Sequence, residues 1–337
     1  MRWGALVAAA ALLACSACEA LARTDDPLHV VRGPLPARIE HPLALTELAL
    51  VPRRPIAEAP GNIGATLTSA YTSIFEQHTS APYTVQFDGE LWRNAARLRL
   101  GLSPGVDLET EIAVLYASGG FLDHFITELH HFLQVPNQGR EKVDDDEFDM
   151  RIQSGGSTLY ELEPNTVGLQ DLPLIATFGE PSERIGDWNR ALRLGIELPI
   201  GSSTHGFGNG GVDYGVGVCA ERSIGRTTHH LGANVVFPAR PAGFLGSGVH
   251  VEDVYELVYG FEYRWSDAVS WILQVDALSP LVRDIPFAEI DSPIVDIGVG
   301  CFRDLDRWSR VFASFHDDAV ANSGPDFTLL VGWMSAL

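Results

Sequence analysis

Three residues of the stretch GGFLDHFITELHHFLQVPNQGREK have side chains that could bind a metal: His124, Glu128 and His131. Spacings of four and seven residues place them on one face of a helix. Two imidazoles and a carboxylate can ligate zinc, but the usual helical zinc motif has its two histidines four residues apart, and here that pair is His and Glu. We therefore keep a metal site as the alternative and expect no cofactor.

The same stretch predicts a short amphipathic helical insert near residues 119–135. Phe121, Phe125, Leu129 and Phe132 recur on one side of such a helix. A stripe of this kind needs an apolar partner, and the surrounding elements must supply it. We expect the helix to cover a barrel mouth or to lie in a lumen.

Other strings that resemble sites lack the context their chemistry needs. Residues 206–211 match G-x-G-x-x-G but are followed by strand-like VDYGVGV, whereas a dinucleotide site needs a helix there. The acidic run 144–147 lacks the spaced ligands of a calcium loop. His229-His230 falls at a turn or strand start, and no G-x-S-x-G elbow occurs. A Ser and a His on adjacent strands could still form a barrel-embedded lipid hydrolase, which stays an alternative.

From about residue 62 the chain alternates apolar and polar residues, which is the pattern of β-strands. In VYELVYGFEYRW, residues 254–265, the aromatic and aliphatic side chains share one face and the charged ones the other. Counting such segments gives 12 or 13. Because single-chain bacterial barrels use even numbers, we expect an all-β, antiparallel transmembrane barrel of about 12 strands, with 14 as the alternative.

Three details favour a membrane barrel over a soluble sandwich or a lipocalin-like barrel. The segments are long, aromatic residues gather toward their ends, and glycines populate the polar face. These glycines are Gly101, Gly195, Gly215, Gly217, Gly298 and Gly300. A crowded lumen suits such a face better than a solvated exterior does.

One hairpin predicts a lumen charge ladder. If Gly101 pairs with Asp107 across Ser103-Pro104-Gly105, then Arg99 lies opposite Glu109 and Arg97 opposite Glu111. The leucines between them then face lipid. By the same parity Cys219 and Cys301 face opposite sides of the wall, so they form no disulfide.

The ends of the chain indicate export. Residues 1–22 carry a short basic start, an apolar run and an Ala20-Leu21-Ala22 cleavage signal, so we interpret them as a signal peptide; lipidation at Cys15 is the alternative. Residues 23–60 are rich in proline and predict an arm before the fold, and residues 61–337 the barrel. The expected location is the outer membrane. A net charge of −21 argues against nucleic acid as a partner.

Several stretches resemble a domain-of-unknown-function family of Gram-negative outer-membrane β-barrel proteins. They are Gly33–Arg38 with His41–Leu43, residues 119–130, residues 136–141, Leu198–Gly201, Gly210–Asp213 and Gly324–Leu329. The most specific one carries Gly120, Asp123, His130, Asn137 and Arg140. The chain departs from the pattern at Ile39-Glu40-His41 and at its end, where Leu337 replaces the aromatic residue that the barrel insertion machinery reads.

We expect a non-enzymatic protein: a narrow pore or carrier for a small solute, or a structural barrel, with outer-membrane lipid as its surroundings. Twelve strands enclose a narrow lumen, and inward arginines and glutamates would fill much of it. A barrel-embedded lipid hydrolase and a metal-binding membrane protein are the alternatives.

Overall fold

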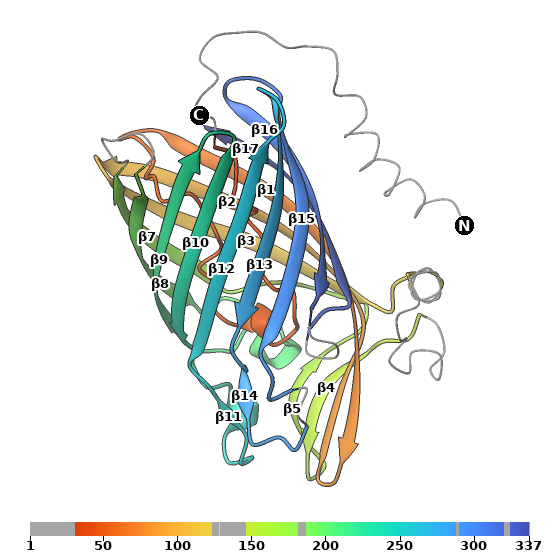
Figure 1. Ribbon diagram of the computed structural model, residues 1–337. Helices are drawn as coiled ribbons and strands as arrows, with labels where there is room; N and C mark the ends of the chain where they lie inside the picture. The colour runs from red at the N-terminus through yellow and green to blue at the C-terminus, as the bar shows by residue number, and fades with distance from the viewer. Residues whose placement is uncertain are drawn as a thin grey trace.

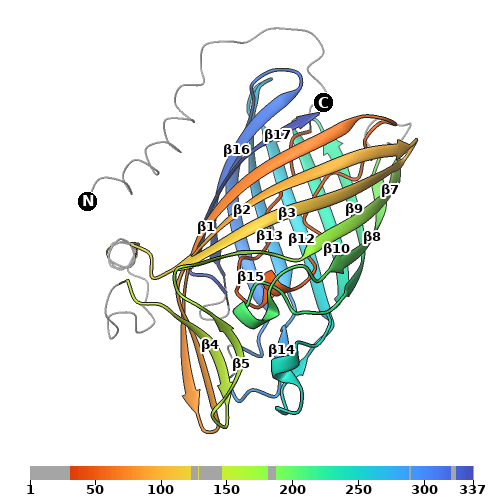
Figure 2. The same ribbon diagram turned by 180° about the vertical axis from the view of Figure 1, so that it is seen from behind.

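The computed structural model describes residues 31–122, 128, 146–180, 187–287, 290–319 and 324–336. Twelve strands form a closed antiparallel ring (Figures 1 and 2). They are β1 (Ile63–Ser80), β2 (Tyr83–Ser103), β3 (Val106–Ser118), β7 (Leu172–Glu180), β8 (Asn189–Leu198), β9 (Asp213–Ile224), β10 (Thr227–Phe237), β12 (Val254–Arg264), β13 (Val269–Leu278), β15 (Ile294–Asp304), β16 (Ser309–Asp318) and β17 (Phe327–Ala336). Pairing of β1 with β17, from Gly64 opposite Ala336 to Ser73 opposite Phe327, closes the ring. The predicted fold class and the strand number of 12 are confirmed.

The two ends of the barrel differ in their connections. One end, here the turn end, has the start of β1, the end of β17 and short turns at 104–105, 225–226, 265–268 and 305–308. The other, the loop end, has the long connections 119–171, 199–212, 238–253, 279–293 and 319–326. In bacterial outer-membrane barrels the short turns face the periplasm and the long loops face outward.

The outer face of the ring is apolar and exposed, which excludes the soluble sandwich. On the β2–β3 hairpin the outward residues Leu98, Leu100, Leu102, Leu108 and Ile112 are 38% to 56% exposed. Outward tryptophans lie toward strand ends, with Trp265 and Trp308 more than half exposed near the turn end. A barrel whose outer face is apolar with aromatic residues at its edge is built for lipid.

β1 and β2 are longer than the 10–12 residues that the pattern predicts. Beyond Ser73, β1 leaves β17 and continues with β2 past the ring, where β4 (Asp149–Ser154) and β5 (Ser157–Leu162) extend the sheet. This extension of β1 and β2 comprises residues 74–80 and 83–89. The remaining short elements are β6 (Thr166–Leu169), β11 (His250–Val251), β14 (Val282–Arg283), η1 (Ala44–Thr46), η3 (Ser203–His205) and η4 (Ala242–Phe244).

The extension and the long loops enclose a hydrophobic core at the loop end, which we name the cap. Its buried members include Ile39, Leu43, Leu45, Ile74, Phe87, Met150, Ile152, Tyr160, Phe207, Phe244, Val249 and Ile285. Three of these, Ile39, Leu43 and Leu45, precede the barrel in sequence, so residues from the arm complete the core of the loops. β1 and β2 are long because their ends wall this core.

The predicted helical insert near 119–135 stays a prediction. Within 123–145 the structure describes Glu128 alone, as helical and exposed. Among the described residues, no helix has the length and apolar character needed to cross a membrane.

Candidate functional site: a lumen filled by the arm

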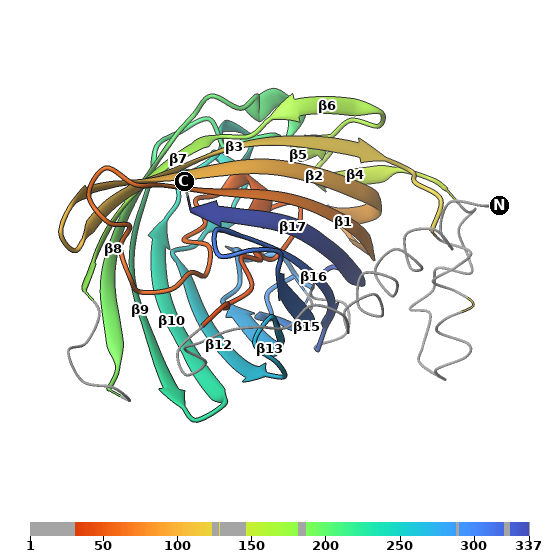
Figure 3. The same ribbon diagram turned by 90° about the horizontal axis from the view of Figure 1, so that it is seen from above.

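Residues 31–60, here the arm, lie inside the barrel. The red chain in Figure 3 passes through the ring rather than outside it, and nearly all side chains from Val31 to Val51 are buried. The sequence predicts an arm before the fold but not its place. The arm rises from the turn end, bends at the loop end and returns to the turn end, where it enters β1. We name residues 31–38 and 49–57 the shaft and residues 39–48 the tip.

The first part of the shaft binds the wall formed by β12, β13 and β15. The backbone amide of Arg32 donates to the Glu262 carboxylate at 3.1 Å, and its guanidinium donates to Asp304 at 2.9 Å. One step further, the amide of Leu35 donates to Gln274 at 2.9 Å. Wall side chains thus accept hydrogen bonds from the backbone amides of a segment whose prolines prevent regular strand pairing.

The tip closes the loop end from inside. The His41 ring packs edge-on against Phe87 at 5.0 Å between centroids, and Gln170 donates to the carbonyl of Leu45 at 2.9 Å. Burial lowers the pKa of His41 to about 3, although the Glu76 carboxylate lies 4.0 Å away. The imidazole is therefore neutral at physiological pH, as an apolar core requires.

The returning shaft carries the strongest polar contacts. Arg53 binds Asp107 through two hydrogen bonds of 2.9 and 2.7 Å, and Arg54 binds Glu221 through two of 3.0 and 2.7 Å. Both are bidentate guanidinium–carboxylate pairs, the geometry that gives such pairs their strength. At the turn end, Glu58 pairs with Arg99 of β2 at 3.1 Å.

The luminal glycines make room for the arm. A Cβ at Gly215 would lie 2.9 Å from Leu48 and 3.1 Å from Leu50, and one at Gly300 would lie 2.9 Å from Leu35. At Gly101 a Cβ would meet the carbonyl oxygen of Ala59 at 2.0 Å. The glycine-rich face that the sequence shows is therefore the surface on which the arm lies, and the wall is shaped for it.

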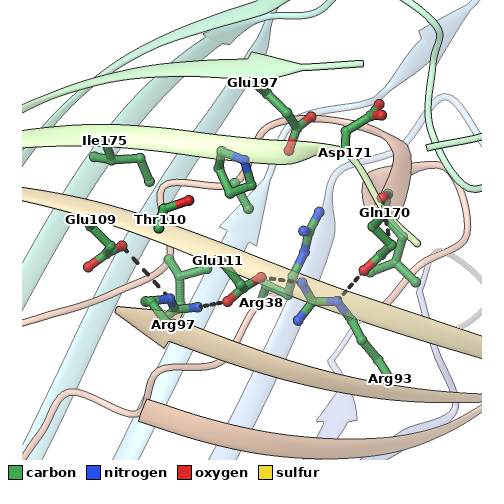
Figure 4. Close-up of a pocket in the computed structure, with 14 residues that line it drawn as sticks. Arg38, Arg93, Arg97, Glu109, Thr110, Glu111, Gln170, Asp171, Ile175 and Glu197 are labelled. Atoms are coloured by element: carbon green, nitrogen blue, oxygen red, sulfur yellow. Dashed lines mark hydrogen bonds and ion pairs between the residues drawn. The ribbon is translucent and has the colours of Figure 1, made fainter. Parts of the chain in front are cut away.

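The predicted register of the charge ladder is confirmed: Arg97 lies opposite Glu111 and Arg99 opposite Glu109. The side chains pair differently, however. Arg97 binds Glu111 at 2.5 Å and approaches Glu109 at 3.8 Å, as Figure 4 shows. Arg99 instead pairs with Glu58 of the arm. Its neighbouring carboxylates, Asp107 and Glu109, bind Arg53 of the arm.

The wall is acidic where it faces the arm. Outside the extension of β1 and β2, the described inward residues that are buried include nine carboxylates and three arginines. They are Asp107, Glu109, Glu111, Glu197, Asp213, Glu221, Glu262, Asp276 and Asp296 (the wall carboxylates), with Arg93, Arg97 and Arg193. The three arginines bind Glu109 or Glu111. The arm adds Arg32, Arg38, Arg53 and Arg54.

The arm packs closely against the wall, as the burial of nearly all its side chains from Val31 to Val51 shows. Two cavities there measure about 10 Å³ each, the size of one water site. One lies among Arg38, Arg97, Glu111 and Glu197 (Figure 4), and the other beside His316. The lumen is thus filled by the arm as well as by the inward charges that the sequence predicts.

A serine, a histidine and an aspartate form a chain of hydrogen bonds inside the barrel. Ser314 Oγ lies 2.8 Å from His316 Nε2, and His316 Nδ1 lies 2.7 Å from Asp296. All three are buried and luminal, and the backbone of Ser314 pairs with β15 and β17 on its two sides. The backbone amides beside it are thereby committed to the sheet, so they form no oxyanion hole. A lipid hydrolase would need this pair on the outer face.

The predicted metal ligands fall mostly outside the described residues: His124 and His131 do so, and Glu128 is exposed. Among the residues that the structure does describe, no group of three His, Cys, Asp or Glu is arranged to hold a metal ion. The described cysteines are both free, with Cys219 buried in the lumen and Cys301 on the opposite face, as the parity predicts.

Of the residues that carry the family-like motif, Gly120 is described, and Asp123, His130, Asn137 and Arg140 lie outside the described residues. Gly120 has a φ of +79°, and a Cβ there would overlap the Glu90 carboxylate. The amides of Phe121 and Leu122 donate to Glu90 at 3.1 and 2.6 Å. Glycine is needed here because the chain turns closely over a buried carboxylate.

Sequence reasoning missed the arm arginines as site residues. Arg32, Arg53 and Arg54 stand in a proline-rich segment whose position the pattern leaves open. Two signals were present in the sequence. Residues 31–60 contain four arginines and precede a barrel whose inward positions carry many carboxylates, and glycines recur at inward positions.

Comparisons with known proteins agree with the fold. The model of a family described as protein of unknown function (DUF3187) matches residues 10–335. The crystal structure of the COG4313 outer membrane channel from Pseudomonas putida F1 is similar with a TM-score of 0.56 and 12% identity, covering 86% of this chain and 100% of that one. The NanC porin structure gives 0.48 and 9%, covering 81% and 100%. No curated protein matches the sequence.

Proposed function

The chain belongs to the DUF3187 family, and from the geometry of its lumen we propose that it is a non-enzymatic channel of the outer membrane whose resting state is closed by its own arm. The observation that carries the proposal is the arm itself: a segment inside a closed barrel, held to the wall by charged groups and connected to it at the turn end. We further propose that residues 1–22 direct export and are removed.

The charged wall favours a channel over a purely structural barrel. Replacing buried ion pairs by apolar residues is often neutral or stabilising, so stability alone does not call for nine buried carboxylates. A polar inner face is what a water-filled barrel needs. If the arm leaves, water would solvate these groups and a small solute could pass. The channel described for Pseudomonas putida F1 shares the fold, and we extend that function to this chain as part of the proposal.

Conductance of the purified, folded protein in planar bilayers tests this proposal. We expect the full chain to be closed most of the time and the Arg53→Gln/Arg54→Gln variant to open more often, because two bidentate anchors of the shaft are lost. The matched control is Arg226→Gln, at an exposed turn residue. Absence of conductance in all three proteins, each shown to be folded by heat-modifiable gel mobility, would refute the channel.

The hydrogen-bonded Ser314 provides a second check on the non-enzymatic assignment. We expect no reaction with a fluorophosphonate probe in either the full chain or the Arg53→Gln/Arg54→Gln variant, because no oxyanion hole is built beside Ser314. Labelling that Ser314→Ala abolishes would overturn this part of the proposal.

A further inference from the structure

Building on the proposed channel, we propose that the solutes it transports are small molecules carrying a guanidinium group. Arg53 and Arg54 of the arm occupy the binding sites for that group in the resting state. The arm is in this sense a resident ligand of its own lumen. The inference names the solute class and rests on the channel function for transport, but the two sites can be tested without conductance.

The first site is formed by β3 and β7. The two terminal nitrogens of Arg53 each meet one oxygen of Asp107, at 2.9 and 2.7 Å, and the hydroxyl of Thr177 accepts a further hydrogen bond at 3.2 Å. Asp107 and Thr177 are fully buried. A planar fork of donors matches this arrangement, whereas an ammonium group is a point charge and would use it only in part.

The second site is formed by β8 and β9. Arg54 Nε and Nη2 meet the two oxygens of Glu221 at 3.0 and 2.7 Å. Asn189 of β8 donates to the same carboxylate at 3.0 Å, which fixes its orientation. The carboxylate is buried, yet the arginine that binds it is one third exposed. A guanidinium from solution could therefore approach this site first.

The rest of the wall favours cations along the path. The three buried wall arginines are each bound to a wall glutamate, and Arg99 pairs with the arm, whereas the nine buried wall carboxylates outnumber these arginines. Toward the loop end, Glu197 lies directly opposite Asp213, and one Glu197 oxygen is buried without a hydrogen-bond partner. A passing cation would supply the charge that this pair lacks, and an anion would be repelled.

Competition with the tethered arm sets the concentration of free guanidinium ion that is needed to displace it. The arm arginines are tethered, and short flexible tethers correspond to effective concentrations in the millimolar range. A free guanidinium ion should therefore displace them at millimolar concentration, well below the molar range in which it denatures proteins. Sodium at the same ionic strength lacks the planar donors and should displace them much less.

Cys219 reports displacement in the native chain. It lies on the luminal face of β9 between Gly217, next to Leu50, and Glu221, which binds Arg54. We expect its modification by a charged thiol reagent to rise with millimolar guanidinium chloride but not with equal sodium chloride. Loss of labelling in the Cys219→Ser variant would show that the label is on Cys219. Asp107→Asn/Glu221→Gln should free the arm and abolish the guanidinium dependence, while Glu163→Gln, an exposed residue, should preserve it.

Ion selectivity completes the test. Across a potassium chloride gradient, the open Arg53→Gln/Arg54→Gln variant should show a reversal potential of the sign expected for cations. Guanidinium should block its current, and adding Asp107→Asn should weaken that block about tenfold, the effect of losing one charge-assisted contact.

The outcomes separate the two proposals. Anion selectivity, or Cys219 labelling that rises equally with sodium and guanidinium, would overturn the guanidinium sites and leave the channel standing. Guanidinium-specific labelling of a folded protein that never conducts would support the sites and refute the channel.

Discussion

The shaft and the tip of the arm are held by different forces. The shaft binds through guanidinium–carboxylate pairs and through hydrogen bonds from its backbone to wall side chains. The tip is held mainly by burial of Ile39, Leu43 and Leu45 in the cap, beside a neutral histidine, with hydrogen bonds from Gln170 and to Asp213 added to it. Attraction between charges depends on salt and on competing ions, whereas apolar burial does not weaken in this way.

This difference indicates how the arm could open the channel. The shaft can exchange its partners for water or for a dissolved cation, since the wall carboxylates are stable when hydrated. The tip has no such substitute, because leaving the cap exposes apolar surface. We expect the shaft to loosen first while the tip stays in place. Four changes break or sharpen the contrast, from the largest expected effect to the smallest.

Removing the central shaft anchor should have the largest effect. Arg53→Gln leaves Asp107 without its bidentate partner, and breaking a buried ion pair from one side costs about 3–5 kcal/mol. We expect faster labelling of Cys219 with no change in the cap. Arg226→Gln is the control. Unchanged labelling at low and high salt would show that the shaft does not depend on this pair.

Truncating the wall of the cap should loosen the tip and spare the shaft. Phe87→Ala removes a fully buried ring that packs on His41, at a cost of about 3 kcal/mol. Protease cleavage within 39–48 should increase, and Cys219 labelling should stay low. Leu98→Ala, on the outer face and half exposed, is the control. If Cys219 labelling rises together with cleavage, the two parts of the arm form one cooperative unit.

Filling a luminal glycine should displace the arm where the tip meets the returning shaft, without touching the charges of the shaft. A side chain at Gly215 meets Leu48 and Leu50, so Gly215→Val should weaken seating of the arm by about 1–3 kcal/mol through overpacking. Cys219 labelling measures this effect. The outward neighbour Val216→Leu should leave labelling unchanged, and equal effects of the two substitutions would argue against direct contact.

Acid should weaken the tip through His41. The pKa of His41 is lowered to about 3 in the folded state, against about 6.5 in an unfolded chain. The stability from its neutral form is therefore complete above pH 6.5 and is lost as pH falls toward 3. At pH 5.5 the loss is about 1 kcal/mol. Hydrogen exchange of the tip amides, corrected for intrinsic rates, should rise, and His41→Gln should remove this dependence. Equal pH dependence in both proteins would assign the effect to another group.

The local sequence pattern predicts much of the barrel because the facing of strand residues and the register of hairpins depend on residues close together in the chain. Alternation fixes which residues face lipid, and the turn Ser103-Pro104-Gly105 fixes the hairpin register. Which carboxylate Arg99 binds is not fixed this way, since the choice depends on a third segment. The same holds for the long ends of β1 and β2, which pack on a core that the loops and the arm form together.

By itself the sequence determined an antiparallel barrel of twelve strands, its lipid-facing side and the charged, glycine-rich character of its lumen. These follow from a period of two residues and from turn chemistry, which act over short distances along the chain. Only the tertiary structure decided that the proline-rich arm fills that lumen. Its prolines exclude sheet pairing but prescribe no partner, and its contacts join residues up to 279 positions apart. Such a position is set by the shape and charge of the closed wall, which exist only once the ring has formed.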